Sequence, residues 1–439
     1  MKVIQQPIKQ IIETIGYQEI IKSKRYRPLR YTLSIQVDKG ILIYNILLGS
    51  LVLLEPGEDH NEFMIKTWYY VIEEFDDIRL VKELRKKLKR LEGRNIPLTT
   101  YTIFSTTDCN ANCPYCFELG RTKMHMSLDI AKKSALFILG HAQGHKVNFR
   151  WFGGEPLYNQ APIDCICSIL KDHKVDFISR MATNGFLFDN NSLNKAKQLW
   201  NLTQVQITLD GTRELYNKTK QYNNNVDGFE RVLENIVLLT ENNIEVVIRL
   251  NVDNTTIDSQ LKLLKDDLFP RFAGNRYITI YTHLLNDTLI TIDSSKREKM
   301  FCGKRELDKL IVDNGFSRHK FIPKTFKLYR CIADNKHSIT ILPSGKIGLC
   351  EHFTESYYIS NLDNFEKIDK KAVKNLRRYK KDLKICLDCV FYPRCIRLVN
   401  CPDMRICCEE LKNQNVDHLK TEALNEYKLW LEKTVQSRS

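Results

Sequence analysis

The sequence lacks a long, unbroken apolar segment. Residues Met1 to Pro7 contain no continuous apolar run, so we expect no secretory signal. The longest apolar run, from Ile41 to Leu54, is interrupted by polar residues and is shorter than the roughly 20 residues that a membrane-spanning helix needs. We therefore predict a cytoplasmic chain with no membrane partner.

Cysteine, in contrast, is abundant in a chain for which no export is expected. The 439 residues include 14 cysteines. Disulfides are rare in the cytoplasm, so these cysteines are expected to be reduced thiols that ligate metal. The length alone suggests roughly two to three domains of about 150 residues each.

One short run has three cysteines but no fourth. Cys109, Cys113 and Cys116 have the spacing Cys-x3-Cys-x2-Cys and follow a predicted strand directly. Three thiolates can bind three irons of a cubane iron–sulfur cluster and leave the fourth iron open. An open metal position is typical of a catalytic site rather than a structural one. A zinc site is the alternative, and His125 is the next candidate ligand along this loop.

This run, with Tyr115 in its last gap, resembles the signature of the radical S-adenosylmethionine (radical SAM) superfamily. Gly153, Gly154 and Glu155, at the end of the second predicted strand, resemble its motif for the amino group of SAM. Glycines let backbone carbonyls approach a ligand, and a carboxylate can pair with an ammonium group. The resemblance implies a [4Fe-4S] cluster that binds SAM and cleaves it to a 5′-deoxyadenosyl radical.

Later strand ends add further matches to the same superfamily. Thr183 and Asn184 resemble a segment near the SAM ribose, and Arg249 matches a position where a basic residue faces the SAM carboxylate. Asp210 lies in a Leu-Asp-Gly turn and is expected only to shape that turn. Asn-Gly and Asp-Gly are also ordinary turn formers, which is the alternative for these segments.

Strand and helix patterns alternate between Tyr101 and Tyr281, which predicts a parallel sheet with right-handed crossovers. The predicted strands are Tyr101–Ser105, Val147–Phe152, Phe177–Ala182, Val205–Leu209, Val246–Leu250 and Tyr277–Tyr281. The predicted helices are Ser127–Leu139, Pro162–Leu170, Ser192–Leu199, Phe229–Glu241 and Ser259–Leu268, with Ser127 and Ser192 as N-caps. The fold class is therefore α/β, a partial (β/α)6 radical SAM barrel with its chemistry at the carboxyl ends of the strands.

The first 97 residues are expected to form a small N-terminal α+β module. Three strands, Leu33–Val37, Ile41–Tyr44 and Val52–Leu54, precede two helices near Asn61 to Glu74 and Asp76 to Leu91. Residues 93–97 are the expected linker, 98–300 the barrel, and 301–439 a cysteine-rich domain that ends in a helix near Asp417 to Val435. The module could recognise a leader peptide or simply pack against the barrel.

The C-terminal cysteines resemble the SPASM extension, which carries up to two auxiliary [4Fe-4S] clusters. The resemblance implies one cluster on Cys331, Cys350 and Cys401, and another on Cys386, Cys389, Cys395 and Cys407 or Cys408. The spacing after Cys395 departs from the usual pattern, so the fourth ligand of the first cluster is either a substrate thiol or Cys302. A zinc ribbon at Cys386 and Cys389 is the alternative. Cys165 and Cys167 are expected to be core residues.

Glu351 directly follows Cys350. In the sulfatase-maturating branch this position carries an aspartate that acts as a base, so Glu351 is our candidate catalytic residue. The alternative is an ordinary solvent-exposed glutamate.

The resemblance implies a peptide maturase that abstracts hydrogen from a ribosomally synthesised precursor peptide and installs a thioether or carbon–carbon cross-link. Its electron donor would be a flavodoxin or ferredoxin. A formylglycine-forming sulfatase maturase is the alternative product, and a degenerate peptide-binding scaffold is another possibility. The net charge of +14 also fits a basic zinc-binding nucleic-acid-binding protein, although we expect no nucleic acid partner. A basic helix contributes to that charge with Lys82, Arg85, Lys86, Lys87, Lys89 and Arg90.

Overall fold

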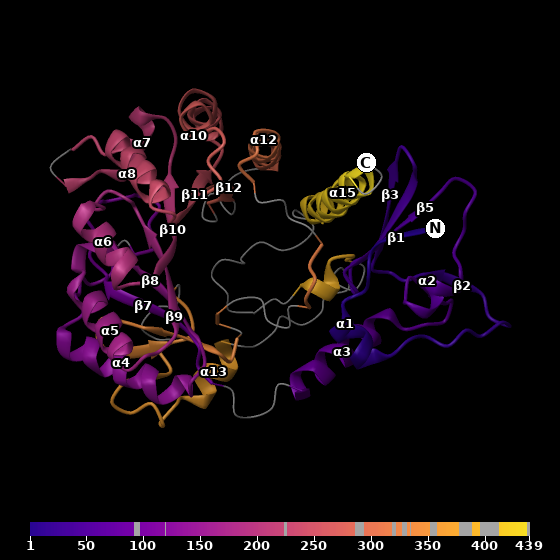
Figure 1. The fold of residues 1–439 in the computed structure, drawn as a ribbon, viewed down its shortest axis with the longest axis horizontal. Coiled ribbons are helices and arrows are strands. Elements are labelled where there is room, and N and C mark those ends of the chain that lie inside the picture. Colours follow the sequence, from indigo (N-terminus) through magenta and orange to yellow (C-terminus); the bar gives the residue numbers. More distant parts are fainter. Residues whose placement is uncertain are drawn as a thin grey trace.

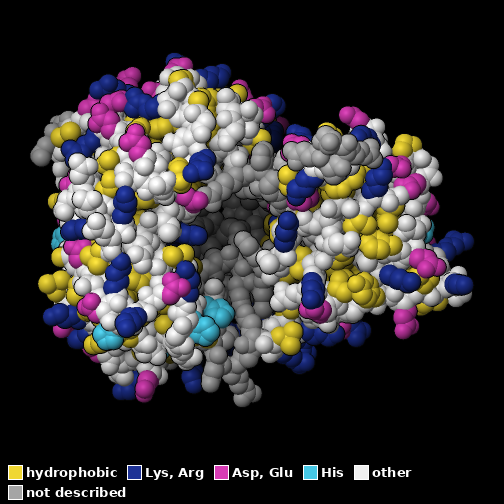
Figure 2. All heavy atoms as spheres, viewed as in Figure 1, with side chains coloured by type: hydrophobic (Ala, Val, Ile, Leu, Met, Phe, Trp, Pro, Cys, Tyr) yellow, Lys and Arg dark blue, Asp and Glu magenta, His cyan; other side chains and the backbone are white. Residues whose placement is uncertain are grey.

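The computed structural model of this chain describes residues 1–91, 97–118, 120–223, 226–285, 294–317, 322–326, 332–333, 335–351, 358–376, 389–395 and 412–436. These residues form two bodies with a hollow between them (Figures 1 and 2). One body is built around a parallel sheet, and the other combines the N-terminal elements with the last helix (Figure 1).

The parallel sheet has its six central strands side by side in sequence order. They are β7 (Thr100–Thr106), β8 (Val147–Gly153), β9 (Phe177–Thr183), β10 (Leu202–Leu209), β11 (Glu245–Val252) and β12 (Ile278–Leu284). All six predicted strands are confirmed, and each is extended by one to three residues at one or both ends, although β12 begins one residue later than predicted. Because the strands are parallel, their carboxyl ends share one edge of the sheet.

Helices cover the outer face of this sheet (Figure 1). They are α4 (Leu128–Ala142), α5 (Ala161–Asp172), α6 (Asn190–Gln198), α7 (Arg213–Lys220), α8 (Phe229–Glu241), α9 (Ile257–Lys262), α10 (Phe269–Phe272) and α12 (Ser294–Asp313), with short η1 (Pro156–Asn159) and the π-helical η3 (Leu263–Leu268). Apolar residues at alternate strand positions, such as Phe149 and Val205, pack against them in one continuous core. Period-2 alternation therefore leaves the intervening side chains on the inner face.

Two serines were predicted as helix N-caps. Ser127 caps α4, because its side chain accepts a hydrogen bond from the Ile130 amide. The prediction for Ser192 is wrong: Asp189 is the N-cap of α6, and Ser192 is the third helical residue of a capping box. Aspartate and serine both favour the N-cap position. In this capping box Asp189 is the N-cap, and the Ser192 side chain bonds back to it.

The C-terminal region adds three strands to the same sheet. They are β13 (Ser338–Ile341), β14 (Lys346–Gly348) and β15 (Ser360–Asn361), followed by α13 (Lys370–Leu376) and the short η5 (Tyr392–Arg394). Strand β13 runs parallel to β7, with Thr340 beside Thr102. The cysteine after β14, Cys350, is thereby brought to the β7 side of the barrel sheet, two strands away from β7.

The N-terminal module contains a four-stranded sheet in the order β1-β5-β4-β3. Its elements are β1 (Lys2–Gln5), α1 (Lys9–Ile15), β2 (Tyr26–Pro28), β3 (Thr32–Val37), β4 (Gly40–Asn45), β5 (Ser50–Leu54), α2 (Glu62–Lys66), β6 (Tyr70–Ile72) and α3 (Asp77–Leu91). The predicted helix from Asn61 to Glu74 is wrong in its second half, where the chain forms β6 and pairs with β2. The three strands predicted from alternation are confirmed.

The last helix, α15 (Lys412–Gln436), packs on the N-terminal sheet rather than on the barrel. Leu419 and Ala423 are buried against Tyr44 and Leu51 of that sheet. No helix among the described residues is long and apolar enough to cross a membrane. The domain boundaries at residues 97 and 300 stay predictions; α12 runs through residue 300.

Candidate active site

The cysteine loop follows β7 and is joined to the glycine turn that ends β8. The Gly154 and Glu155 amides donate to the carbonyls of Thr106 and Asp108 at 3.2 and 2.9 Å. Gly153 has a φ of +130°, and a Cβ there would lie 2.0 Å from the Thr106 carbonyl oxygen. A Cβ on Gly154 would lie 2.3 Å from the Asp108 carbonyl oxygen. Only glycine fits this contact, so the two predicted motifs form one structural unit.

Glu155 is fully buried and joins the ends of β8 and β9. One carboxylate oxygen accepts from the Leu157 amide at 3.1 Å, and the other accepts from the Asn184 amide at 2.8 Å. The Thr183 hydroxyl lies within 2.8 Å of both oxygens. Burial raises the pKa of Glu155, and these donors oppose that shift. A pairing of Glu155 with the SAM ammonium stays a prediction.

Asn184 lies directly beside the first cysteine. Its side-chain amide is 3.8 Å from Cys109 Sγ and donates to the side chain of Asn110 at 2.7 Å. Thr183 and Asn184 therefore meet the cysteine loop at the carboxyl end of β9. This is the edge of the sheet where the sequence placed the site.

A buried ion pair lies beside the cysteine loop, and no sequence pattern predicted it. Lys220, in the last turn of α7, lies 2.9 Å from the carboxylate of Asp210, and both side chains are almost completely buried. The Tyr115 hydroxyl donates to the same carboxylate at 2.8 Å. Burial acts to lower the pKa of Lys220, but Asp210 and Tyr115 outweigh it and raise that pKa. Asp210 therefore does more than shape a turn.

Lys220 also contacts the cysteine loop through its backbone. Its carbonyl accepts from the Asn112 amide at 2.8 Å and lies 4.0 Å from Cys113 Sγ. Asn251 of β11 donates to Asp210 at 2.9 Å, which connects a further strand end to this network. A lysine at the end of an amphipathic helix is common on protein surfaces, so no sequence signal distinguished this one.

The three cysteines lie in surroundings that disfavour thiolates unless a positive charge is near. Burial raises the pKa of the Cys109 thiol to about 12 and also raises the pKa of the Cys113 and Cys116 thiols. Thiolates at these positions need nearby positive charge, which iron supplies. Within the described residues, no three His, Cys, Asp or Glu side chains are close enough to hold one single metal ion. A cubane cluster differs in this respect, because each thiolate binds a separate iron.

Arg249 and Tyr281 face each other on the inner side of the sheet. They are directly opposite on β11 and β12. Burial raises the pKa of Tyr281, and the charges of Arg249 and of Arg150, three strands away from β11, lower it. Arg249 and Arg150, which lie on strands three positions apart, are therefore both close enough to Tyr281 to influence its pKa. The role of Arg249 against the SAM carboxylate stays a prediction.

Glu351 is 7% exposed, so the solvent-exposed alternative is wrong. One of its carboxylate oxygens lies 2.9 Å from Arg150 Nη1, and the other is buried and has no hydrogen-bond partner among the described residues. Its backbone carbonyl accepts from Arg121 at 3.3 Å. Glu118 pairs with Arg121 at 2.9 Å, and its other buried oxygen likewise has no partner in the part of the chain that the structure describes. Burial raises the pKa of Glu118 to about 7.

Only part of the predicted auxiliary cysteine set is described. Cys350 packs beside the barrel core, and Cys389 and Cys395 flank η5 at the N-terminal module. Cys331, Cys386, Cys401, Cys407 and Cys408 lie outside the described residues. Cys302 is exposed on α12. Cys167 is fully buried and Cys165 partly buried in the barrel core, which confirms their prediction as core residues.

The sequence matches a known family over part of its length. Residues 103–267 match the radical SAM superfamily. The match covers the strands that carry the cysteine loop, the glycine turn and Arg249. It supports the enzyme interpretation over a zinc-binding nucleic-acid-binding protein.

The likeness to solved structures covers more of the chain than residues 103–267. The structure of anSMEcpe with bound AdoMet and Cp18Cys peptide has a TM-score of 0.56 at 15% identity, and the likeness covers 76% of this chain and 99% of that one. The structure of Streptococcus suis SuiB bound to precursor peptide SuiA has a TM-score of 0.51 at 13% identity, covering 84% and 94%. At these identities the likeness concerns the fold.

Curated relatives match shorter stretches. Adenylate kinase 2 of Plasmodium falciparum is 28% identical over 184 residues, 41% of this chain. Uncharacterized protein MJ0907 of Methanocaldococcus jannaschii is 28% identical over 154 residues, 35% of this chain. The chain spans 63% and 52% of the lengths of these relatives. The Gly-x4-Gly-Lys-Ser/Thr phosphate loop does not occur in this sequence.

Proposed function

We propose, from the premise that this chain belongs to the radical SAM superfamily and is a radical SAM enzyme, that it modifies a ribosomally synthesised peptide. The fold prediction is confirmed: the chain has the α/β radical SAM fold with a parallel sheet and additional N- and C-terminal regions. The single observation that carries the proposal is the meeting of the cysteine loop, the glycine turn and Asn184 at one edge of that sheet.

In this proposal Cys109, Cys113 and Cys116 hold the catalytic [4Fe-4S] cluster. When bound, the cluster would supply the electron for cleavage of SAM to the 5′-deoxyadenosyl radical that would abstract hydrogen from the peptide. Glu155 holds Thr183 and Asn184 in place through the hydrogen bonds described above. The half-buried Tyr115 ring and Arg249 are the further candidate SAM contacts.

The residues around Cys350 are proposed to face the peptide. Glu351 has one oxygen fixed by Arg150 and one buried oxygen free of hydrogen bonds among the described residues. A free carboxylate oxygen beside an auxiliary cluster could accept a proton as the substrate is oxidised. We propose that role for Glu351 and assign the auxiliary clusters to the C-terminal cysteines named above.

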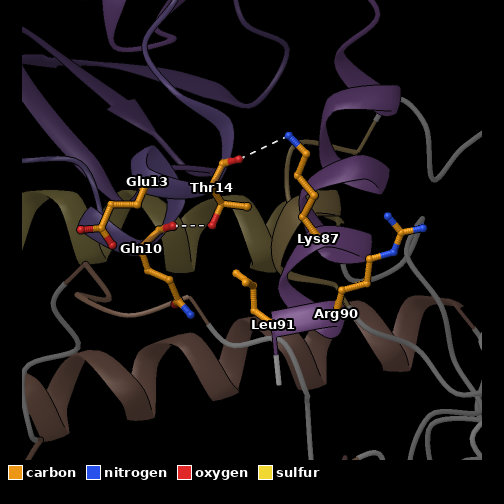
Figure 3. A pocket seen from close by; sticks show the side chains of 6 residues that line it. All are labelled: Gln10, Glu13, Thr14, Lys87, Arg90 and Leu91. Carbon is orange, nitrogen blue, oxygen red and sulfur yellow. Dashed lines mark hydrogen bonds between the residues drawn. The ribbon is translucent and has the colours of Figure 1, made fainter. Parts of the chain in front are cut away.

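The N-terminal module is proposed to bind the leader of the precursor peptide. A groove of about 420 Å³ lies between α1 and α3 (Figure 3). Its lining residues are Gln10, Glu13, Thr14, Lys87, Arg90 and Leu91. Leu91 is 73% exposed, and Lys87 and Arg90 are exposed beside it. An amphipathic helix with acidic side chains would match this mixture of apolar and basic groups.

The first experiment is anaerobic reconstitution with iron and sulfide, followed by an iron count and an assay for SAM cleavage under dithionite. About twelve irons are expected in the wild type and about eight in the Cys109→Ala, Cys113→Ala, Cys116→Ala variant. The wild type should release 5′-deoxyadenosine, and this variant should release none. A Cys165→Ala, Cys167→Ala variant is the matched control and should keep both the iron and the activity. Bound zinc without SAM cleavage would overturn the proposal.

The product is tested by mass spectrometry on the short peptides encoded beside this gene. A cross-link removes two hydrogen atoms and joins two residues, whereas formylglycine formation oxidises a single cysteine or serine. Because serine oxidation also removes two hydrogen atoms, fragmentation spectra that locate the change distinguish the two products. We propose cross-linking, in the cytoplasm, with a flavodoxin or ferredoxin as the electron donor. If none of the neighbouring peptides is cross-linked and a neighbouring sulfatase is converted instead, formylglycine formation is favoured.

A further inference from the structure

One row of side chains crosses the inner face of the parallel sheet at the level of Arg150. The strand register places Arg150 of β8 directly opposite Arg180 of β9, and Arg180 directly opposite Gln204 of β10. Thr102 of β7 lies on the other side of Arg150. Two arginines are therefore immediate neighbours in the middle of the sheet.

Alternation along the strands sets the face that these arginines occupy. Phe149 and Trp151 flank Arg150, and Met181 follows Arg180; all three are buried in the core beneath the outer helices. Side chains at successive strand positions point to opposite faces. Arg150 and Arg180 consequently point to the inner face of the sheet, away from the helices that cover its outer face. Arg180 is exposed there, and the Arg150 side chain is 39% exposed.

One arginine of this row has no ion pair among the described residues. Arg150 pairs with Glu351 and Arg121 pairs with Glu118. Arg180 makes no ion pair or hydrogen bond with any other described residue. Its neighbour Gln204 is neutral and donates at 2.9 Å to Glu245, which is the next residue of the row and is two strands away from Arg180. Like charges directly opposite each other destabilise a sheet, so an anion bound beside these two arginines would be stabilising.

The position of this pair relates it to the proposed reaction. Arg150 and Arg180 lie three residues before Gly153 and Thr183, which is about 10 Å below the edge that holds the cysteine loop. Arg150 also contacts Glu351, the residue after Cys350. Arg150, with Arg180 next to it, therefore lies beside the residue that is proposed to face the peptide.

We propose that Arg180, with Arg150 beside it, binds one carboxylate group of the peptide substrate. This inference rests on the proposed peptide substrate and adds the chemistry of the group recognised. The guanidinium fork matches a carboxylate with two parallel hydrogen bonds, which a lysine cannot reproduce. The carboxylate comes either from an Asp or Glu side chain or from the free C-terminus of the peptide.

The test measures binding of three synthetic tripeptides to the reconstituted protein by ligand-observed NMR. They are acetyl-Gly-Glu-Gly-amide, acetyl-Gly-Gln-Gly-amide and acetyl-Gly-Gly-Gly with a free C-terminal carboxylate. The wild type should bind at least one carboxylate peptide about tenfold more tightly than the neutral peptide. Preference for the first or the third peptide distinguishes the side-chain source from the terminal one.

Arg180→Gln should remove this preference, and Arg180→Lys should restore it only in part. Arg213→Gln is the matched control, because Arg213 lies on α7, 62% exposed, and pairs with Asp227. Equal binding of all three peptides by the wild type, or an unchanged preference in Arg180→Gln, would overturn the proposal. Release of 5′-deoxyadenosine is measured without peptide on the same samples, so loss of that activity reports on the proposed function and not on carboxylate binding.

Discussion

Two cysteine-bearing segments of this molecule are supported in different ways. The loop with Cys109, Cys113 and Cys116 is held by groups at the ends of neighbouring barrel strands, such as Asn184. The turn from Cys389 to Cys395 is held by a residue from a distant part of the chain. Arg85 of α3 donates to the carbonyls of Tyr392, Pro393 and Cys395 at 2.8, 3.0 and 2.9 Å.

The difference shows that the two proposed cluster regions depend on different parts of the chain. The first depends on the barrel, because the groups described above that contact the loop lie at the ends of barrel strands or on α7. The second depends on the N-terminal module and on α15, where Glu422 pairs with Arg394 at 2.6 Å and accepts from Tyr44 at 3.1 Å. Binding of a leader to the module could therefore act on the auxiliary region directly.

The largest effect is expected from the buried pair beneath the catalytic loop. Lys220→Met leaves Asp210 buried without its counter-charge, and breaking such a pair costs about 3–5 kcal/mol of unfolding free energy. Urea unfolding of the apo protein measures this cost. Lys195→Met is the matched control, because its pair with Asp164 is 29% exposed on both sides and should contribute about 1 kcal/mol or less.

A second variant separates charge from packing at the same site. Asp210→Asn combined with Lys220→Met removes both charges and should recover part of the stability that Lys220→Met loses. Tyr115 and Asn251 can still bond to the amide at that position. Equal stability of Lys220→Met and Lys195→Met would show that the pair does not support the loop.

The sequence predicted the first region much better than the second. Strand alternation and the cysteine spacing placed the loop, the glycine turn and Asn184 at one edge of the sheet, because burial patterns in strands follow a fixed period. Lys220 was not predicted as a site residue, because the pattern of a helix does not reveal a buried ion pair. Arg85 was grouped with a basic helix face, yet it is half-buried while Lys86 and Lys87 are exposed. Its partners lie 307 residues or more away, and no local pattern encodes such a contact.

An intermediate effect is expected at Arg85. Arg85→Ala removes a charged donor from three backbone carbonyls and should cost about 1.5–3 kcal/mol of unfolding free energy. Its ring contact with Tyr392 is lost as well. Lys86→Ala, one residue along the same helix, should cost about 0.5 kcal/mol or less.

The same Arg85 variant tests the separation of the two regions. Reconstituted Arg85→Ala should hold less iron than the wild type and should still release 5′-deoxyadenosine. Loss of SAM cleavage with full iron content would mean that the N-terminal module acts on the catalytic loop instead, and the comparison would fail.

The smallest effect is expected from the local cap of α6, which follows the Asn184 segment. Asp189→Ala removes an N-cap and should cost about 0.5–2 kcal/mol, whereas Asp189→Asn keeps a capping side chain and should cost less. The hydrogen bond from the Ser192 amide lowers the pKa of Asp189 below its usual 3.8. A lowered folded-state pKa contributes stability above the unfolded-state pKa, and this stability is lost as the pH falls through the folded-state value. The gap between wild type and Asp189→Ala in urea unfolding should therefore shrink below about pH 4, while Asp189→Asn shows no such titration. A gap that stays constant down to pH 2 would mean that the carboxylate does not cap the helix through its charge.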